Sequence, residues 1–180
     1  MSVIKHKDQR VAVFIDTQNI YHSAKNLHKA KVNFGKVVQD AVAGRHLIKS
    51  LAYVISSDSG EEQGFFEALQ KAGIEPKTKD LQVFSSGAKK ADWDVGLAVD
   101  AIKMAPKVDA IILVAGDGDF VPFVEYVQVA HGCQVEVVAF GKSTSSKLIE
   151  AADEFVNLDE DPKKYLMHDN RLRIIPSKKK

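Results

Sequence analysis

Residues 108–120, which read VDAIILVAGDGDF, constrain the fold of this chain more than any other stretch. Five apolar residues at 110–114 form a run that is too short for a helix and has the length of a buried strand. The run ends in GDGD at 116–119, where two glycines favour a tight turn and two carboxylates follow a hydrophobic element. Like charges about 4 Å apart repel by about 4 kcal/mol at an effective dielectric of about 20, so a divalent cation is the usual partner of such a cluster. The alternative is a loop of two solvated aspartates, the second capping a helix that begins at Phe120.

Other apolar runs repeat this pattern along the chain. Strands are predicted at 11–15, 47–55, 75–84, 110–114, 134–140 and 154–158, the third of them more exposed because of its lysines. Helices are predicted between them, at about 20–30, 34–42, 61–72, 93–104, 120–131 and 147–152. Strands that alternate with helices indicate βαβ crossovers. The predicted fold class is therefore α/β, with a mainly parallel central sheet and helices on both of its faces.

Sheets of this kind bind ligands beyond the carboxyl ends of their strands, where the strand order reverses. Asp16 follows the first predicted strand, and Asp117 follows the fourth. These two strands are expected to be neighbours at the reversal point. We therefore expect the two carboxylates to meet there.

A third acidic segment, KADWDV, precedes the central strand. Asp94 lies at the start of the helix predicted at 93–104, and the spacing alone leaves open whether that helix begins at the same end of the sheet. The alternative role is helix capping by Asp94 or by Asp92. Asp100, two turns into the helix, is either a solvated residue or a partner of the acidic cluster.

Carboxylates without a histidine or cysteine ligand favour a hard cation, Mg²⁺ or Mn²⁺. Such an ion lowers the pKa of a bound water and shields the charge of a phosphate, so the predicted reaction is hydrolysis of a phosphodiester. Side chains that could hold the substrate are Asn19, Lys89, Lys90 and Ser143. Their alternative roles are a helix start for Asn19, solvated lysines in a flexible loop at 85–92, and capping of the following helix for Ser143.

Composition excludes several classes of protein. The apolar fraction of 45% and the charged fraction of 27% are ordinary for a globular domain. No apolar run reaches membrane-spanning length, and the first ten residues lack the hydrophobic core of a signal peptide, so a cytoplasmic protein without a membrane partner is expected. The single cysteine, Cys133, gives no disulfide framework and no zinc cluster.

The net charge of +1 hides an asymmetry between the body and the end of the chain. Residues 161–180 carry seven Lys or Arg against two Asp, whereas residues 1–160 carry eighteen Lys or Arg against twenty-two Asp or Glu. One domain at 1–160 and a flexible basic tail at 161–180 are therefore predicted. Such a tail either binds phosphate backbones or only solubilises the chain.

Taken together, the motifs VFIDTQNIY, KKADWDVGLAVDA and AGDGDF, followed by KLIEAADEFVNLDED, resemble the NYN domains of the LabA/DUF88 group, relatives of the PIN-domain nucleases. The resemblance runs from about residue 11 to residue 161. It implies a Rossmann-like α/β/α sandwich and an acidic pocket of the metal-dependent ribonuclease type, with the helix of Asp94 beginning at that pocket. By this resemblance the principal metal-site carboxylates are Asp16, Asp94 and Asp117, with Asp119 and Asn19 in support.

The sequence departs from the commonest pattern of this family at one place. Asp92 and Trp93 stand where a glycine–valine pair usually precedes the motif aspartate. The change adds a carboxylate and bulk beside the pocket, and it leaves open whether Asp92 is a ligand or a cap.

Two other enzyme classes fit poorly. A phosphatase of the haloacid dehalogenase class needs an acid two positions after its nucleophile, where this chain has Gln18. A dinucleotide-binding domain needs a glycine-rich turn after the first strand, and DTQN supplies none. The prediction is a metal-dependent ribonuclease acting on single-stranded RNA, and a homodimer is compatible with it. The alternative is an RNA-binding or regulatory module that keeps the acidic pocket and does not cut.

Overall fold

A six-stranded, all-parallel sheet forms the centre of the molecule, with the strand order β4-β3-β1-β7-β8-β9. The computed structural model describes residues 3–56, 62–80, 85–87 and 92–167, together with the backbone of 82–83 and 89–90. The order reverses between β1 and β7, as in Rossmann folds, so the predicted fold class and the predicted pairing of these two strands are confirmed. The strands of this sheet are β1 (Arg10–Asp16), β3 (His46–Ser56), β4 (Glu75–Asp80), β7 (Ala110–Val114), β8 (Gln134–Ala139) and β9 (Glu154–Asn157).

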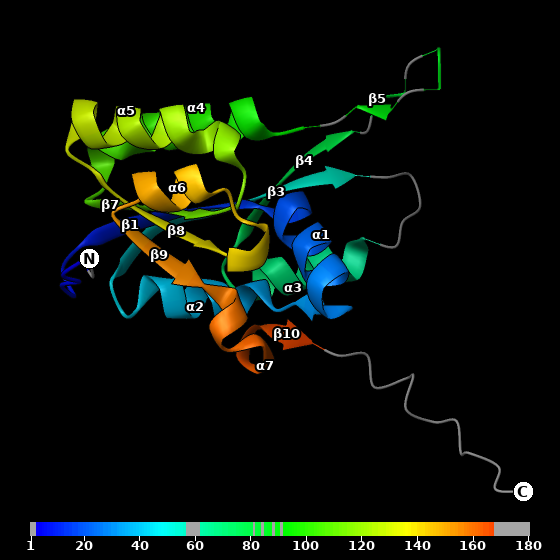
Figure 1. Ribbon diagram of the computed structural model, residues 1–180, viewed down its shortest axis with the longest axis horizontal. Coiled ribbons are helices and arrows are strands. Elements are labelled where there is room, and N and C mark those ends of the chain that lie inside the picture. Colours follow the sequence, from blue (N-terminus) through cyan, green and yellow to red (C-terminus); the bar gives the residue numbers. More distant parts are fainter. Residues whose placement is uncertain are drawn as a thin grey trace, which may run out of the picture.

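Helices cover both faces of the sheet (Figure 1). One face carries α1 (Thr17–His28), α2 (Phe34–Val42), α3 (Gln63–Lys71) and the short α7 (Pro162–Tyr165). The other face carries α4 (Asp94–Met104), α5 (Val121–His131) and α6 (Ser146–Ala151). Short 3₁₀ turns complete the chain as η1 (Ala105–Lys107), η2 (Gly118–Phe120), η3 (Gly141–Ser143) and η4 (Leu158–Glu160). Within the described part of the chain, no helix is both long enough and apolar enough to cross a bilayer.

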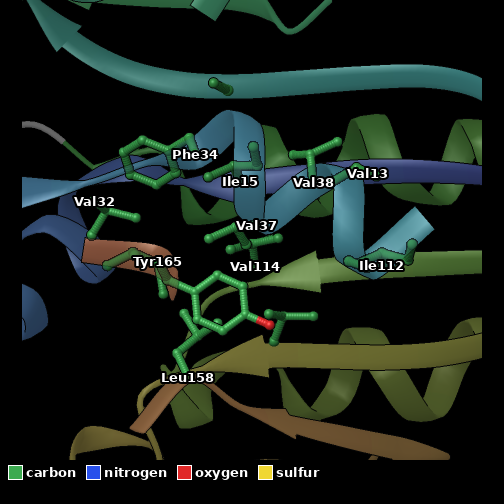
Figure 2. Close-up of a cluster of buried hydrophobic side chains, with 14 of the residues drawn as sticks. Val13, Ile15, Val32, Phe34, Val37, Val38, Ile112, Val114, Leu158 and Tyr165 are labelled. Atoms are coloured by element: carbon green, nitrogen blue, oxygen red, sulfur yellow. The ribbon is translucent and has the colours of Figure 1, made fainter. Parts of the chain in front are cut away.

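The two central strands are buried on both faces, which explains why their sequences are continuous apolar runs rather than alternating ones. Figure 2 shows Val13 and Ile15 of β1 packed with Ile112 and Val114 of β7 against the side chains of α2 and α7. The alternate residues of both strands, such as Phe14 of β1, face α4 and α5 instead.

Capping residues set the helix limits much as the sequence indicates. Asn33 caps α2 by accepting the backbone N–H of Lys36 at 3.0 Å, and α2 ends where Ala43 adopts a left-handed conformation. Gly132 ends α5 with a φ of 59°, a conformation that glycine adopts without strain. The predicted helix boundaries therefore lie within two or three residues of those in the structure.

The described structure continues beyond residue 160, after which the basic tail is predicted. Pro162–Tyr165 form α7, and β10 (Leu166–Met167) pairs antiparallel with β2 (Lys31–Val32). Tyr165 and Leu166 are buried in the core, so the burial of these two side chains outweighs the basic character of their neighbours. Residues 168–180 lie outside the described residues.

One correction concerns the loop expected at 85–92. Two residues of this segment form the strand β6 (Lys89–Lys90). This strand pairs antiparallel with β5 (Gln82–Val83), so the two strands form a short hairpin. Residues 57–61, which follow β3, lie outside the described part of the chain.

Candidate metal centre

An acidic pocket of about 210 Å³ opens at the carboxyl ends of β1 and β3 and the start of α4. Helices that follow parallel strands begin at this edge, so β1 and β7 deliver polar side chains to the same place. The acidic residues that line it are Asp16, Asp92, Asp94 and Asp117. The other described residues that line it are Gln18, Asn19, His22, Tyr53, Ile55 and Trp93.

Three carboxylates come close enough to share one ion. Asp94, Asp117 and Asp119 each offer an oxygen, and these three oxygens lie within 4.8 Å of one another. Asp16 is not part of this group of three, but it lines the same pocket as Asp94 and Asp117. The donor set consists of carboxylate oxygens, which suits a hard divalent cation.

Two carboxylates of the pocket, Asp16 and Asp94, have raised pKa values. Burial raises the pKa of Asp94 to about 6, and the negative charges of the neighbouring aspartates add to the shift. Burial likewise raises the pKa of Asp16, and the charges of Asp117 and Asp92 reinforce the effect. The backbone N–H of Asn19 opposes that shift by donating to the Asp16 carboxylate. A cation in the pocket would remove this mutual repulsion.

Close packing explains the glycines of the turn after β7. A Cβ atom at Gly116 would lie 2.9 Å from Thr144 Oγ1, and one at Gly118 would lie 2.7 Å from Ser145 Oγ. The backbone N–H of Ser145 donates to the Gly116 carbonyl at 2.9 Å, so the next loop lies directly against this turn. Asp117 Oδ1 accepts the backbone N–H of Asp119 at 2.9 Å. The turn therefore holds both aspartates in place.

Asn19 connects the two strand ends that bear the site. Its backbone N–H donates to Asp16 Oδ1 at 3.1 Å, and its Oδ1 accepts the backbone N–H of Gly116 at 2.8 Å. The residue therefore orients the first aspartate and fastens α1 to the turn after β7, while its side chain still lines the pocket.

Trp93 brings the start of α4 to the pocket. Its Nε1 donates to the carbonyl of Val54 in β3 at 3.1 Å, and its ring meets the ring of Tyr53 edge-on, with 5.3 Å between centroids. Asp92 Oδ1 accepts the backbone N–H of Asp94 at 2.9 Å, so Asp92 acts as a cap in addition to lining the pocket. The location of the α4 start, which the spacing left open, is thereby determined.

Asp100 does not line the pocket but lies behind Tyr53. Its Oδ2 accepts the Tyr53 hydroxyl at 2.8 Å and forms an ion pair with Lys77 at 2.6 Å. Burial, together with this bonded carboxylate, raises the pKa of Tyr53 above its ordinary value. Asp100 thus supports the position of Tyr53, which does line the pocket.

Of the remaining predicted substrate residues, only Ser143 has a described side chain, and it lies apart from the carboxylates. Ser143 lies in η3 and donates its hydroxyl to Ser23 Oγ at 2.8 Å, and it is not among the described residues that line the pocket. The 3₁₀ turn directs this hydroxyl toward α1. Lys89 and Lys90 lie in β6, and their side chains fall outside the described part of the chain.

Sequence reasoning missed several side chains that line the pocket, among them Gln18, His22 and Tyr53. A signal for His22 was present, because His22 follows Asn19 by three residues, a spacing that places both on the same face of a helix. Tyr53 could not be found in this way. It pairs in register with Asp16, and the register between β1 and β3 becomes known only from the fold.

Comparisons with known proteins agree with this architecture. The NYN domain family matches residues 10–159. The low amplitude and bright protein LabA of Synechococcus elongatus is 26% identical over 163 residues, which cover 86% of each chain. An uncharacterised protein of Methanocaldococcus jannaschii is 29% identical over 161 residues, covering 86% of this chain and 57% of that protein.

A solved structure extends the comparison to three dimensions. The crystal structure of a protein of unknown function from Vibrio parahaemolyticus superposes with a TM-score of 0.82 and is 32% identical, covering 92% of this chain and 100% of that one. The family match spans the sheet from β1 to η4 and includes every carboxylate of the acidic pocket. The chain therefore belongs to the NYN domain family.

Proposed function

We propose that this protein is a metal-dependent ribonuclease that hydrolyses phosphodiester bonds of single-stranded RNA with Mg²⁺ or Mn²⁺. The observation that carries the proposal is the approach of the oxygens of Asp94, Asp117 and Asp119 to within 4.8 Å of one another. Asp16 lines the same pocket as two of these three carboxylates. The family is typically metal-dependent, and carboxylate oxygens are the ligands that these cations prefer.

The residues of the pocket have different roles in the proposed reaction. Asp16, Asp94, Asp117 and Asp119 would hold the ion, which, when bound, supplies an activated water and shields the charge of the phosphate. Gln18 and His22 line the same pocket, where their N–H groups can donate to phosphate oxygens. Tyr53 and Trp93 close one side of the pocket with aromatic surface, which limits the access of bulk water.

The alternative function is an RNA-binding or regulatory module that does not cut. Among its described lining residues the pocket has no lysine or arginine, so the pocket by itself repels a phosphate. A site of this kind becomes attractive to RNA once a cation is bound, so both functions need the ion, and only an assay for cleavage distinguishes them.

Cleavage of a 5′-labelled, mixed-sequence pool of single-stranded RNA tests the proposal. We expect wild type to produce fragments with Mn²⁺ or Mg²⁺, and Asp117→Asn to cut at least about 100-fold more slowly because one ligand of the ion is lost. Asp8→Asn is the matched control, since Asp8 is an exposed aspartate ahead of β1. Circular dichroism should show that both variants are folded.

The two functions give different results in this assay. RNA that wild type retains on a filter without any fragment, with either metal, would support the binding module and contradict the nuclease. Equal cleavage by wild type and Asp117→Asn would show that the acidic pocket is not the active site.

A further inference from the structure

A second hollow, of about 400 Å³, adjoins the acidic pocket along α1, and we call it the apolar groove. It is continuous with the acidic pocket, because Gln18 and Ile55 line both. Its lining is mainly apolar and aromatic, with Lys31 and Glu62 as its charged members. The side chains that define it are Tyr21 of α1, Phe34 of α2, Val54 of β3, Phe65 of α3 and Met167 of β10.

Lysines border the far side of the apolar groove. Tyr21, Lys31 and Met167 also line a neighbouring hollow, to which Lys25 and Lys29 contribute. Lys25 Nζ lies over the ring of Tyr21, 5.9 Å from its centroid. The surface therefore changes from acidic to apolar to basic in one direction along α1.

Tyr21 is the exposed aromatic side chain at the centre of this series. It is 41% exposed, and its ring meets that of His22 with 5.6 Å between centroids. His22 lines the acidic pocket, so a flat group against Tyr21 would lie next to the carboxylate site. Bases of single-stranded RNA stack on such aromatic rings, and lysines contact the phosphates beside them.

We propose that the apolar groove holds one unpaired nucleobase of single-stranded RNA, stacked on Tyr21, next to the phosphate held at the acidic pocket. Lys25 and Lys29 contact the phosphate that follows this base. The inference rests on the proposed function, since it takes RNA as the substrate of the same site. Stacking tolerates any base, so the groove gives the enzyme a preference for unpaired RNA and not for a sequence.

The order of the three surfaces favours RNA over other occupants. In a nucleotide chain, each sugar that carries a base lies between two phosphates, so a phosphate, a base and the next phosphate match a cation site, an aromatic ring and a pair of lysines in that order. A second copy of the chain would account for the apolar lining, but it would not account for this charge order.

Binding of two labelled oligomers tests the inference without the need for cleavage. One is a fluorescein-labelled dodecamer of uridylate, and the other is an abasic dodecamer with the same number of phosphates, both measured by anisotropy in Ca²⁺ buffer. We expect wild type to bind the oligouridylate about tenfold more tightly than the abasic oligomer, because only the former can stack. Tyr21→Ala should weaken oligouridylate binding about tenfold and leave abasic binding unchanged.

A matched control is available on the other face of the sheet. Tyr126 of α5 is 50% exposed, and Tyr126→Ala should bind both oligomers as wild type does. The inference is overturned if Tyr21→Ala binds both oligomers as wild type does, or if it loses affinity equally for both. Occupation of the groove by residues 168–180 or by a second copy would give the first of these results, and a second copy would also change the sedimentation coefficient of Tyr21→Ala.

The assay separates this inference from the proposed function. If the protein prefers the base-bearing oligomer through Tyr21 but never cuts RNA, the nuclease proposal fails and the base site stands. If it cuts RNA and Tyr21→Ala keeps the wild-type base preference, the base site fails and the nuclease proposal stands.

Discussion

Carboxylates at the two ends of the central sheet differ in whether the chain supplies a cationic partner for them. Toward the amino ends of the strands, Glu136 of β8 forms a two-point ion pair with Arg45, with Nη1–Oε1 and Nη2–Oε2 distances of 2.6 and 2.9 Å. Both side chains are only 1% exposed. Arg45 also donates to the carbonyls of Ala41 and Val42, so its guanidinium is well satisfied.

At the carboxyl ends, the acidic pocket holds carboxylates that have no ion pair with a lysine or arginine within the described ranges. Here the pKa of Asp94 is raised to about 6 by burial and by its neighbours. The chain therefore neutralises a buried carboxylate with its own arginine where that carboxylate supports the fold. It leaves carboxylates unneutralised where a cation from solution would complete the site.

The largest effect on stability is expected for the buried pair of Arg45 and Glu136. Arg45→Met removes the guanidinium and leaves Glu136 buried beside Lys5, whose Nζ is 3.3 Å away. We expect the free energy of unfolding to fall by about 3 to 5 kcal/mol, because the buried charge that remains shares Lys5 with Glu154 and is only partly compensated. Urea unfolding followed by circular dichroism measures the change.

An exposed ion pair provides the control for this substitution. Arg10 pairs with Asp109 at 3.1 Å on the surface, and Arg10→Met should leave the urea midpoint close to that of wild type. A similar midpoint for Arg45→Met and wild type would show that the buried pair does not support the fold, and the contrast between the two ends would lose its basis.

A smaller effect on stability is expected when metal is added, through the acidic pocket. Mn²⁺ at about 100 times its dissociation constant should raise the free energy of unfolding of wild type by about 2.7 kcal/mol, because the ion binds the folded state. Asp94→Asn should lose most of this gain, whereas Asp8→Asn should keep it. Thermal unfolding with Mn²⁺ and with EDTA measures both. An equal gain in wild type and Asp94→Asn would place the ion elsewhere.

The smallest effect is the repulsion inside the acidic pocket when no metal is present. The folded state holds the Asp94 proton more tightly than the unfolded chain, because the pKa is about 6 instead of 3.8. The free energy of unfolding of wild type should therefore fall as the pH rises from about 4 to about 6. In EDTA at pH 7.5, Asp94→Asn should be more stable than wild type by about 1 kcal/mol, since solvent screens this partly exposed carboxylate.

The dependence on pH identifies the origin of that gain. The advantage of Asp94→Asn should vanish below about pH 4, where both side chains are neutral. An advantage that is equally large at pH 4 and pH 7.5 would reflect packing and not charge.

Much of this architecture can be predicted from local sequence patterns. The apolar runs that end at Asp16 and Asp117 predicted two neighbouring strands whose acidic ends meet, and the structure confirms the pairing. The position of Asp94 could not be derived from spacing, because it depends on the bond from Trp93 to Val54, which are 39 residues apart. The family resemblance supplied what the spacing could not.

Residues that depend on register or on long-range packing were harder to predict. Tyr53 reaches the pocket because it pairs with Asp16, and Tyr165 enters the core because β10 adds to β2. Both placements bring together segments that are far apart in the chain. Local patterns predicted the strands and helices themselves, but not which side chains such pairings expose or bury.

The hydrogen bonds of Asn19 distinguish the first turn of α1, which belongs to the acidic pocket, from the later turns of the same helix. Since the amide oxygen of Asn19 accepts the N–H of Gly116, the first turn of α1 is fixed to the loop after β7. The later turns of α1, which carry Tyr21 and Lys25, are free of that constraint. The outer surface of α1 can therefore diverge among related proteins while the arrangement of the acidic pocket at its beginning stays the same.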